Sequence, residues 1–190
     1  MLNENSTITP LLNRCQKNDR IGQKQLFFLY NEFALRICYR YAGIEQDPTI
    51  FMHEAFVRLF KSISQLEYNA WSHDKHSFKN WFKRILIDSC IELGKPSHGQ
   101  IEDSLFESVQ YSELNKNERI DLSAKDIIDI LRSLPFGYRT VFNLWVIDGF
   151  SYQDISMKLK VPIDELRFDL MKARENLRKL LQPISVTESP

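Results

Sequence analysis

Apolar residues recur at every third or fourth position through most of this 190-residue chain, and this spacing limits its fold more than any other feature. The segment "QLFFLYNEFALRICYRYAG" is typical, because its apolar residues fall on one face of a helix. They are Leu26, Tyr30, Phe33, Ile37 and Tyr41. No segment has the alternating pattern of β-branched residues that indicates half-buried strands. The sequence therefore predicts an all-α protein.

Cap residues divide the first 96 residues into four predicted helices. Thr9 with Pro10, and Asp47 with Pro48, each combine an N-cap with a proline suited to the first turn. Ser77 is the predicted N-cap of the last of these helices, which ends near Gly94. The apolar positions of the third and fourth helices are Met52, Phe56, Leu59, Ile63, Phe78, Trp81, Phe82, Ile85 and Leu93. We expect a four-helix domain over residues 1–96.

Residues 97–122 are acidic and polar, and we interpret them as a linker to a second helical domain over 123–182, followed by a tail, 183–190. The motif "SAKD" at Ser123 predicts a capping box, and Ser151 repeats it with Asp154. Pro135 is expected to start a helix that ends near Gly149. The last predicted helix runs from about Asp164 to Leu181, and its core positions are Leu166, Leu170, Ala173, Leu177 and Leu181.

Within this second domain, "DGFSYQDISMKLKVPIDELRFDLMKAR" has the form of a helix-turn-helix. Its apolar residues would hold two helices near a right angle, so that the second presents its N-terminal side chains outward. They are Ile155, Leu159, Val161, Leu166 and Leu170. An ordinary helical hairpin has the same periodicity, so this spacing predicts packing and leaves groove entry open.

In the first domain, "SFKNWFKRI" interleaves aromatic and basic residues. Aromatic side chains can stack on the bases of an unpaired strand, and Lys79, Lys83 and Arg84 would attract its phosphates. The alternative is an amphipathic helix whose aromatic residues are core. Because Phe78, Trp81 and Phe82 fall on one stripe with Ile85, most of these rings are expected in the core, with the basic face available to phosphate.

Several classes of function are disfavoured by composition. Net charge is +3 over residues 1–96, −3 over 97–125 and +1 over 126–182, so the isolated chain should bind duplex DNA weakly. Cys15, Cys38 and Cys90 are interpreted as small core residues in a reducing cytoplasm. We expect no metal site, cofactor, small-molecule substrate, enzymatic activity or membrane insertion, because the histidines lack partners and neither a catalytic set nor a membrane span is visible.

Both halves of the chain resemble bacterial RNA polymerase sigma factors of the extracytoplasmic-function type. The segments "LPFGYRTVFNLWVIDGFSYQDIS" and "KLKVPIDELRFDLMKARENLRKLL" are similar to sigma region four. "HEAFVRLFKSI" and "FKNWFKRILIDSCIEL" are similar to region two. Together they cover most of the chain in the family's order, apart from the linker and the last residues.

The resemblance implies a non-enzymatic specificity subunit. It would bind core RNA polymerase, capture the melted minus-ten strand through its first domain and read the minus-thirty-five element through its second. It also implies an anti-sigma partner. Core-polymerase contacts carry over to Ile50, His53, Glu54 and Arg58, and melted-strand contacts to Lys79, Trp81, Lys83, Arg84 and Asp88.

For duplex DNA, Arg167 is the expected base contact, and Phe168 can touch a thymine methyl. The expected phosphate contacts are Lys172, Arg174, Arg178 and Arg139. Arg174 and Arg178 could equally form surface ion pairs with neighbouring acids.

Some positions depart from the family pattern. Ile50 and Asp169 stand where acidic and basic residues respectively are usual, and Asp88 stands where Asn is common. Lys160 replaces a turn glycine at a position expected to need φ > 0, and Pro162 replaces a capping Ser. These departures keep two alternatives open: a sigma-derived adaptor that has lost promoter reading, and a stand-alone helix-turn-helix repressor.

Overall fold

A computed structural model describes residues 4–64, 75–95 and 123–181, and every element in these ranges is helical. The all-α prediction is confirmed. The chain divides into two compact units, Met1–Gly94 and Lys95–Pro190. The predicted linker, 97–122, and tail, 183–190, lie outside the described residues.

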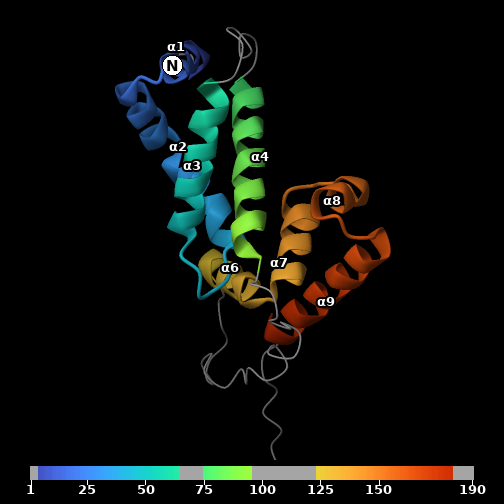
Figure 1. Ribbon diagram of the computed structural model, residues 1–190. Helices are drawn as coiled ribbons and strands as arrows, with labels where there is room; N and C mark the ends of the chain where they lie inside the picture. Colours follow the sequence, from blue (N-terminus) through green and yellow to red (C-terminus); the bar gives the residue numbers. More distant parts are fainter. Residues whose placement is uncertain (1–3, 65–74, 96–122, 182–190) are drawn as a thin grey trace, which may run out of the picture. The chain divides into compact units, whose positions relative to one another are not determined.

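Residues 4–64 and 75–95 of the first unit contain four helices, as predicted: α1 (Glu4–Gln16), α2 (Arg20–Tyr41), α3 (Pro48–Ser64) and α4 (Lys75–Gly94). Helices α2, α3 and α4 pack side by side, and α1 packs against all three (Figure 1). A cluster of rings fills the space between α2, α3 and α4. Phe56 lies 4.7 Å from Phe27 and 5.0 Å from Phe82, between ring centroids. Such pairs each add about 0.5–1.5 kcal/mol beyond their burial.

Three predicted helix features in this unit are wrong. Helix α1 begins before Thr9, so Pro10 lies inside it. Pro10 has no backbone N–H to donate, and burial of Leu12 and Cys15 offsets the cost of the missing hydrogen bond. Helix α4 begins at Lys75, so Ser77 is not its N-cap. Leu93 is exposed, because Leu86, Ile87, Cys90 and Ile91 form the buried side of the C-terminal half of α4. By contrast, α3 does begin at Pro48, with Asp47 Oδ1 accepting from Thr49 N at 2.9 Å.

The three cysteines are free and buried, which confirms their assignment to the core. Burial raises the pKa of the Cys15 thiol to about 11, so it stays protonated at neutral pH. Gly22 marks a close approach of α1 to α2, because a Cβ there would lie 2.8 Å from the Cβ of Arg14.

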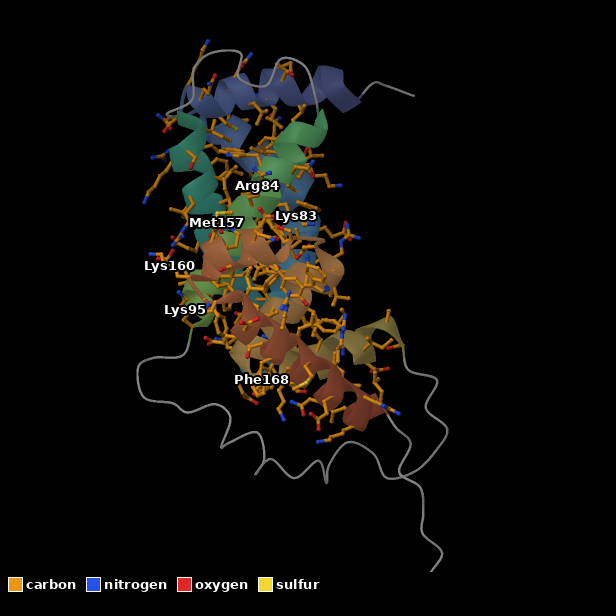
Figure 2. The ribbon with its side chains drawn as sticks, turned by 90° about the vertical axis from the view of Figure 1, so that its right-hand side faces the viewer. Lys83, Arg84, Lys95, Met157, Lys160 and Phe168 are labelled. Carbon is orange, nitrogen blue, oxygen red and sulfur yellow. The ribbon has the colours of Figure 1, made fainter. Side chains whose placement is uncertain are left out.

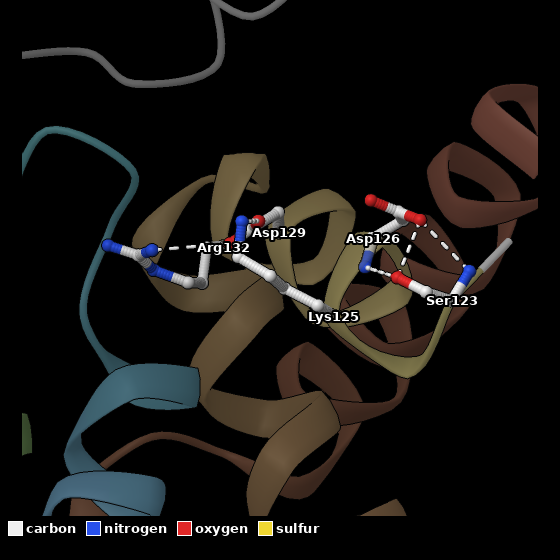
Figure 3. Close-up of polar contacts among 5 residues, drawn as sticks. All are labelled: Ser123, Lys125, Asp126, Asp129 and Arg132. Carbon is white, nitrogen blue, oxygen red and sulfur yellow. Dashed lines mark hydrogen bonds and ion pairs between the residues drawn. The ribbon is translucent and has the colours of Figure 1, made fainter.

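The second unit contains α6 (Ala124–Ser133), α7 (Phe136–Phe142), the π-helix η1 (Asn143–Ile147), α8 (Tyr152–Leu159) and α9 (Ile163–Leu181). Both predicted capping boxes are present. Figure 3 shows the first: Ser123 Oγ accepts from Asp126 N at 3.2 Å, and Asp126 Oδ2 accepts from Ser123 N at 2.9 Å. In the second, Ser151 and Asp154 make the same two bonds at 3.1 and 3.2 Å.

A small core holds these helices together. Its buried members are Leu131, Leu134, Tyr138, Val141, Leu144, Ile155, Leu166, Leu170 and Ala173. The helix predicted from Pro135 to Gly149 is interrupted by η1, where Asp148 N donates to Asn143 O at 2.9 Å across five residues. This extra residue in the turn was not predicted, and it changes the direction of the side chains that follow.

Candidate nucleic-acid interface

Helices α8 and α9 are joined by the short turn Lys160–Pro162, which gives the predicted helix-turn-helix connection. Lys160 has φ 59° and ψ 42°, which confirms the expectation of a left-handed residue at the site of the missing glycine. Ser156 secures the turn, because its carbonyl accepts from Lys160 N at 2.8 Å and its hydroxyl donates to Val161 O at 2.7 Å. Pro162 supplies the capping carbonyl to Leu166 N, so α9 begins at Ile163, one residue before the predicted Asp164.

The apolar side of the motif is only partly as predicted. Ile155, Leu166 and Leu170 are buried, whereas Leu159 and Val161 are half-buried. The first two turns of α9 therefore have one side fixed to α8 and the remaining sides exposed. A second helix held in this way is the arrangement that enters a DNA major groove.

Arg167 and Phe168, two of the side chains expected to face DNA, are exposed near the start of α9, and so is Glu165. Phe168 is 49% exposed, and Lys172 Nζ lies 5.7 Å from its ring centroid; Figure 2 shows Phe168 on α9. Arg167 Nη1 lies 3.4 Å from Asp164 Oδ1 in an exposed ion pair, which is worth less than about 1 kcal/mol and can be exchanged for a DNA contact.

The C-terminal half of α9 carries the expected phosphate contacts. Arg174 and Arg178 are exposed. Arg174 lies seven residues after Arg167 and Arg178 four residues after Arg174, so all three lie on the same side of the helix. Lys172 is half-buried and pairs with Glu175 at 3.5 Å. Glu175 also accepts from Lys179, and this bond, with the charge of Lys172, lowers the pKa of the Glu175 carboxyl.

Arg139 does not belong to this surface, and its prediction as a phosphate contact is wrong. Its side chain is only 4% exposed. Nη1 donates to the carbonyl oxygens of Arg132, at 3.2 Å, and of Leu134. These carbonyls lie at the end of α6, where they have no partner within the helix. Arg139 therefore satisfies a buried helix end and is a structural residue.

On the first unit, the residues expected to meet a melted strand lie on two sides of α4. Trp81, Arg84 and Asp88 are three and four residues apart and share one side, where Trp81 is half-buried and the other two are exposed. Lys79 and Lys83 share another, and Lys79 Nζ lies 4.8 Å from the Phe33 ring centroid. Figure 2 shows Lys83 and Arg84 on the same helix.

The ring positions decide between the two interpretations of this segment. Phe78 and Phe82 are buried and only 6.2 Å apart, so they are core, as expected for most of these rings. Trp81 lies 6.1 Å from Phe78 at the edge of the ring cluster. Among the segment's aromatic residues, Trp81 alone keeps part of its surface exposed, so base stacking would depend on it.

The residues expected to contact core polymerase lie on α3. Ile50 is 59% exposed, His53 is exposed, and the His53 ring lies 6.3 Å from that of Phe27. Arg58 is engaged within the unit: it donates to Glu54 at 2.9 Å and, across to α4, to Glu92 at 2.6 Å. Both carboxylates raise the pKa of Arg58. Arg58 thus fixes the register of α3 against α4 while staying partly accessible.

Two features of these surfaces were not predicted: exposed apolar residues on the first unit and an aromatic stack on the second. Val57 is 45% exposed on the same face of α3 as Ile50, seven residues away, and Phe28 is exposed on α2. An apolar pair at seven-residue spacing on the polar side of a predicted helix was the available signal. The stack of Trp145 on Tyr152 in the second unit depends on the π-helix η1, and no pattern in the sequence indicated it.

Two absences apply to the described parts of the chain. Residues 4–64, 75–95 and 123–181 contain no cluster of three or more His, Cys, Asp or Glu side chains placed to bind a metal. In the same ranges, no helix combines the length and apolar character that a membrane crossing requires.

These features define the class: a helical protein whose second unit is a helix-turn-helix. The model of the family "Sigma-70, region 4" matches residues 124–177. The RNA polymerase sigma-H factor of Pseudomonas aeruginosa is 24% identical, with 92% of this chain and 93% of that protein covered. The ECF RNA polymerase sigma-E factor of Escherichia coli K12 is 25% identical, with 96% and 98% covered.

The sigma-E factor of Haemophilus influenzae is 22% identical, with 95% of this chain and 98% of that protein covered. A solved structure, that of CnrH in complex with the cytosolic domain of CnrY, has a TM-score of 0.45 and 16% identity, and covers 91% of this chain and 96% of its own. This chain is thus similar over nearly its whole length to sigma factors of the extracytoplasmic-function (ECF) group, and its residues 124–177 match the sigma-70 region 4 family.

Proposed function

We propose that this protein is a sigma factor: a subunit that binds core RNA polymerase, selects promoter DNA and starts DNA-templated transcription. The observation that carries this proposal is that relatives named as ECF sigma factors match nearly the whole chain, across both compact units. The comparisons lend no support to an adaptor or to a stand-alone repressor.

In the second unit, α9 would read the duplex upstream element. Its exposed Arg167 can donate two hydrogen bonds to guanine, and Phe168 can contact a thymine methyl. Arg174 and Arg178, further along the helix, would contact phosphates and set the position of the helix. Glu165 can accept a hydrogen bond from cytosine, so the target sequence should differ from that of relatives with small or basic residues here.

In the first unit, α4 would meet the melted strand. Trp81 offers a partly exposed ring for one base, and base stacking on an aromatic side chain is worth about 1–3 kcal/mol. Lys79, Lys83 and Arg84 would attract phosphates. Asp88 accepts hydrogen bonds only and repels phosphate, so it would favour a base amino group over the backbone.

The clamp-facing surface would be the exposed side of α3 around Ile50, His53 and Val57. It offers apolar area beside Glu54, whose carboxylate is already paired with Arg58. A weak intrinsic affinity for DNA is compatible with this role, because polymerase binding raises the effective concentration of promoter contacts. The remaining parts of the proposal are a non-enzymatic role, a cytoplasmic location and control by an anti-sigma partner.

The test is assembly with polymerase. The protein is mixed with bacterial core RNA polymerase and passed through a size-exclusion column, and we expect the two to co-elute. Val57→Glu should reduce co-elution strongly, because it places a charge in the proposed contact. Leu93→Glu is the matched control, an exposed apolar residue on α4 of the same unit, and should co-elute like the natural protein. Elution of the natural protein apart from polymerase would contradict the proposal.

A further inference from the structure

An aromatic stack lies beside the start of α9. The Trp145 and Tyr152 rings are 4.0 Å apart with an angle of 22° between their planes. Trp145 belongs to η1 and Tyr152 is the first residue of α8, so the stack joins two elements of the helix-turn-helix unit. Both residues remain partly exposed, so the stack is at the surface.

Arg167 completes this arrangement from α9. Its guanidinium carbon lies 5.7 Å from the Tyr152 ring centroid, within the range of a cation–π interaction. On its own helix the same guanidinium lies 3.4 Å from Asp164. Two partners of different kinds, a ring and a carboxylate, therefore hold one long side chain that is otherwise exposed.

The π-helix is what brings Trp145 to this place. Asp148 N bonds to Asn143 O across five residues, one more than in an α-helical turn, and Phe150 N bonds to Leu144 O at 3.0 Å across six. Asn143 Nδ2 also donates to Arg139 O at 2.9 Å, which fixes the start of the turn in the core. The side chains within and after this wider turn therefore do not follow the rotation of about 100° per residue of an α-helix.

We propose that Tyr152, supported by Trp145, is a positioning residue that presents the guanidinium of Arg167 to a guanine in the major groove. A flexible arginine must lose rotamer freedom to make two hydrogen bonds to one base, and a guanidinium already held over a ring loses less. Tyr152 thereby determines how strongly the protein prefers one base at one promoter position. This inference rests on the proposed function.

The experiment measures base preference position by position. Holoenzyme, made from the full chain and bacterial core polymerase, is incubated with a promoter fragment found by run-off transcription and randomised over its upstream element. Bound DNA is sequenced. The position at which Arg167→Ala removes the preference is the Arg167 position. Tyr152→Leu, which keeps an apolar side chain without a ring, should weaken the preference there about 2- to 5-fold, as expected for loss of an exposed cation–π contact.

Three further variants separate positioning from folding. Tyr152→Phe keeps the ring and should keep the preference. Phe150→Leu is the matched control, because Lys158 Nζ lies 6.0 Å from the Phe150 ring in the same unit and away from the base contact; preference should be unchanged. Tyr152→Leu combined with Arg167→Ala should show the same base preferences as Arg167→Ala alone, because the ring acts through the arginine.

The outcomes are distinguishable. The inference fails, while the proposed function stands, if Tyr152→Leu lowers affinity for all sequences equally and the preference at the Arg167 position stays intact. It is also overturned if Tyr152→Leu changes preference in the Arg167→Ala background. If the holoenzyme with the natural chain shows no base preference at any position, the proposed function and the inference fail together.

Discussion

Single residues of the second unit show how burial decides between roles that sequence cannot separate. Arg139 and Arg174 both resemble phosphate contacts, yet only Arg174 is exposed. Arg139 is buried because two carbonyls at the end of α6 need a donor, and a helical pattern does not reveal which arginine will supply it. Lys160 is the opposite case, since the family pattern alone predicted its left-handed conformation.

Arg139→Ala should lower the free energy of unfolding by roughly 2–4 kcal/mol, because it leaves buried carbonyls without a charged donor. Urea denaturation followed by circular dichroism measures this. In the holoenzyme, the folded variant should keep its DNA affinity and salt dependence. A variant of natural stability with a smaller salt dependence would mean that Arg139 contacts phosphate after all.

Lys160→Gly should raise the free energy of unfolding by about 1 kcal/mol, because the left-handed conformation costs a residue with a Cβ roughly that much. Asn18→Gly is the matched control, at φ 55° in the first unit. Its gain should be smaller, since asparagine tolerates this conformation better than lysine. Thermal unfolding of the two variants gives the comparison, and a destabilised Lys160→Gly would contradict the expectation.

At the scale of helices, local chemistry predicted starts well where a side chain caps the backbone. The boxes at Ser123 and Ser151 and the start at Pro48 are as expected. The predictions failed at Pro10 and Ser77, because α1 and α4 begin before these apparent caps. The π-helix after α7 was also beyond prediction, because it depends on how Asn143 and Leu144 are buried rather than on propensity.

The exposed surfaces were also predictable only where they depend on the pattern of a single helix. Periodicity located the exposed start of α9 and the basic positions of α4, since outward positions follow from the buried ones. It could not show that Arg58 reaches Glu92 or that Arg167 lies over Tyr152, because these contacts join separate helices.

Ser123→Ala and Ser151→Ala should each cost about 1 kcal/mol of unfolding free energy through loss of an N-cap. Amide hydrogen exchange should quicken in the first turn of α6 for Ser123→Ala and of α8 for Ser151→Ala. Equal protection in variant and natural protein would contradict the role of these caps.

The first capping box also predicts a pH dependence. Hydrogen bonds from the side chain and backbone of Ser123 lower the pKa of Asp126 below its ordinary 3.8. A carboxyl with a lower pKa in the folded state stabilises the fold above its unfolded pKa, and this is lost as pH falls through the folded value. Protection of the α6 amides from hydrogen exchange should therefore decline below about pH 4. Asp126→Asn should weaken that decline, and an unchanged acid response would contradict this cause.

For the whole molecule, two cores imply two units that respond separately to core substitutions. Leu59 and Leu166 are both fully buried, one in each unit. Replacing either with Ala should cost roughly 2–5 kcal/mol. Hydrogen exchange should show lost protection in the substituted unit with the other unchanged. Equal loss in both units for either variant would mean that they unfold as one.

The central claim, that this chain makes core polymerase specific for promoters, is tested most directly by run-off transcription. Core RNA polymerase is incubated with a pool of genomic fragments from the source organism, with and without the purified protein. We expect discrete new transcripts that start at defined sites only when the protein is present. Binding of the protein to polymerase without any new transcript would contradict the claim and favour a sigma-derived adaptor.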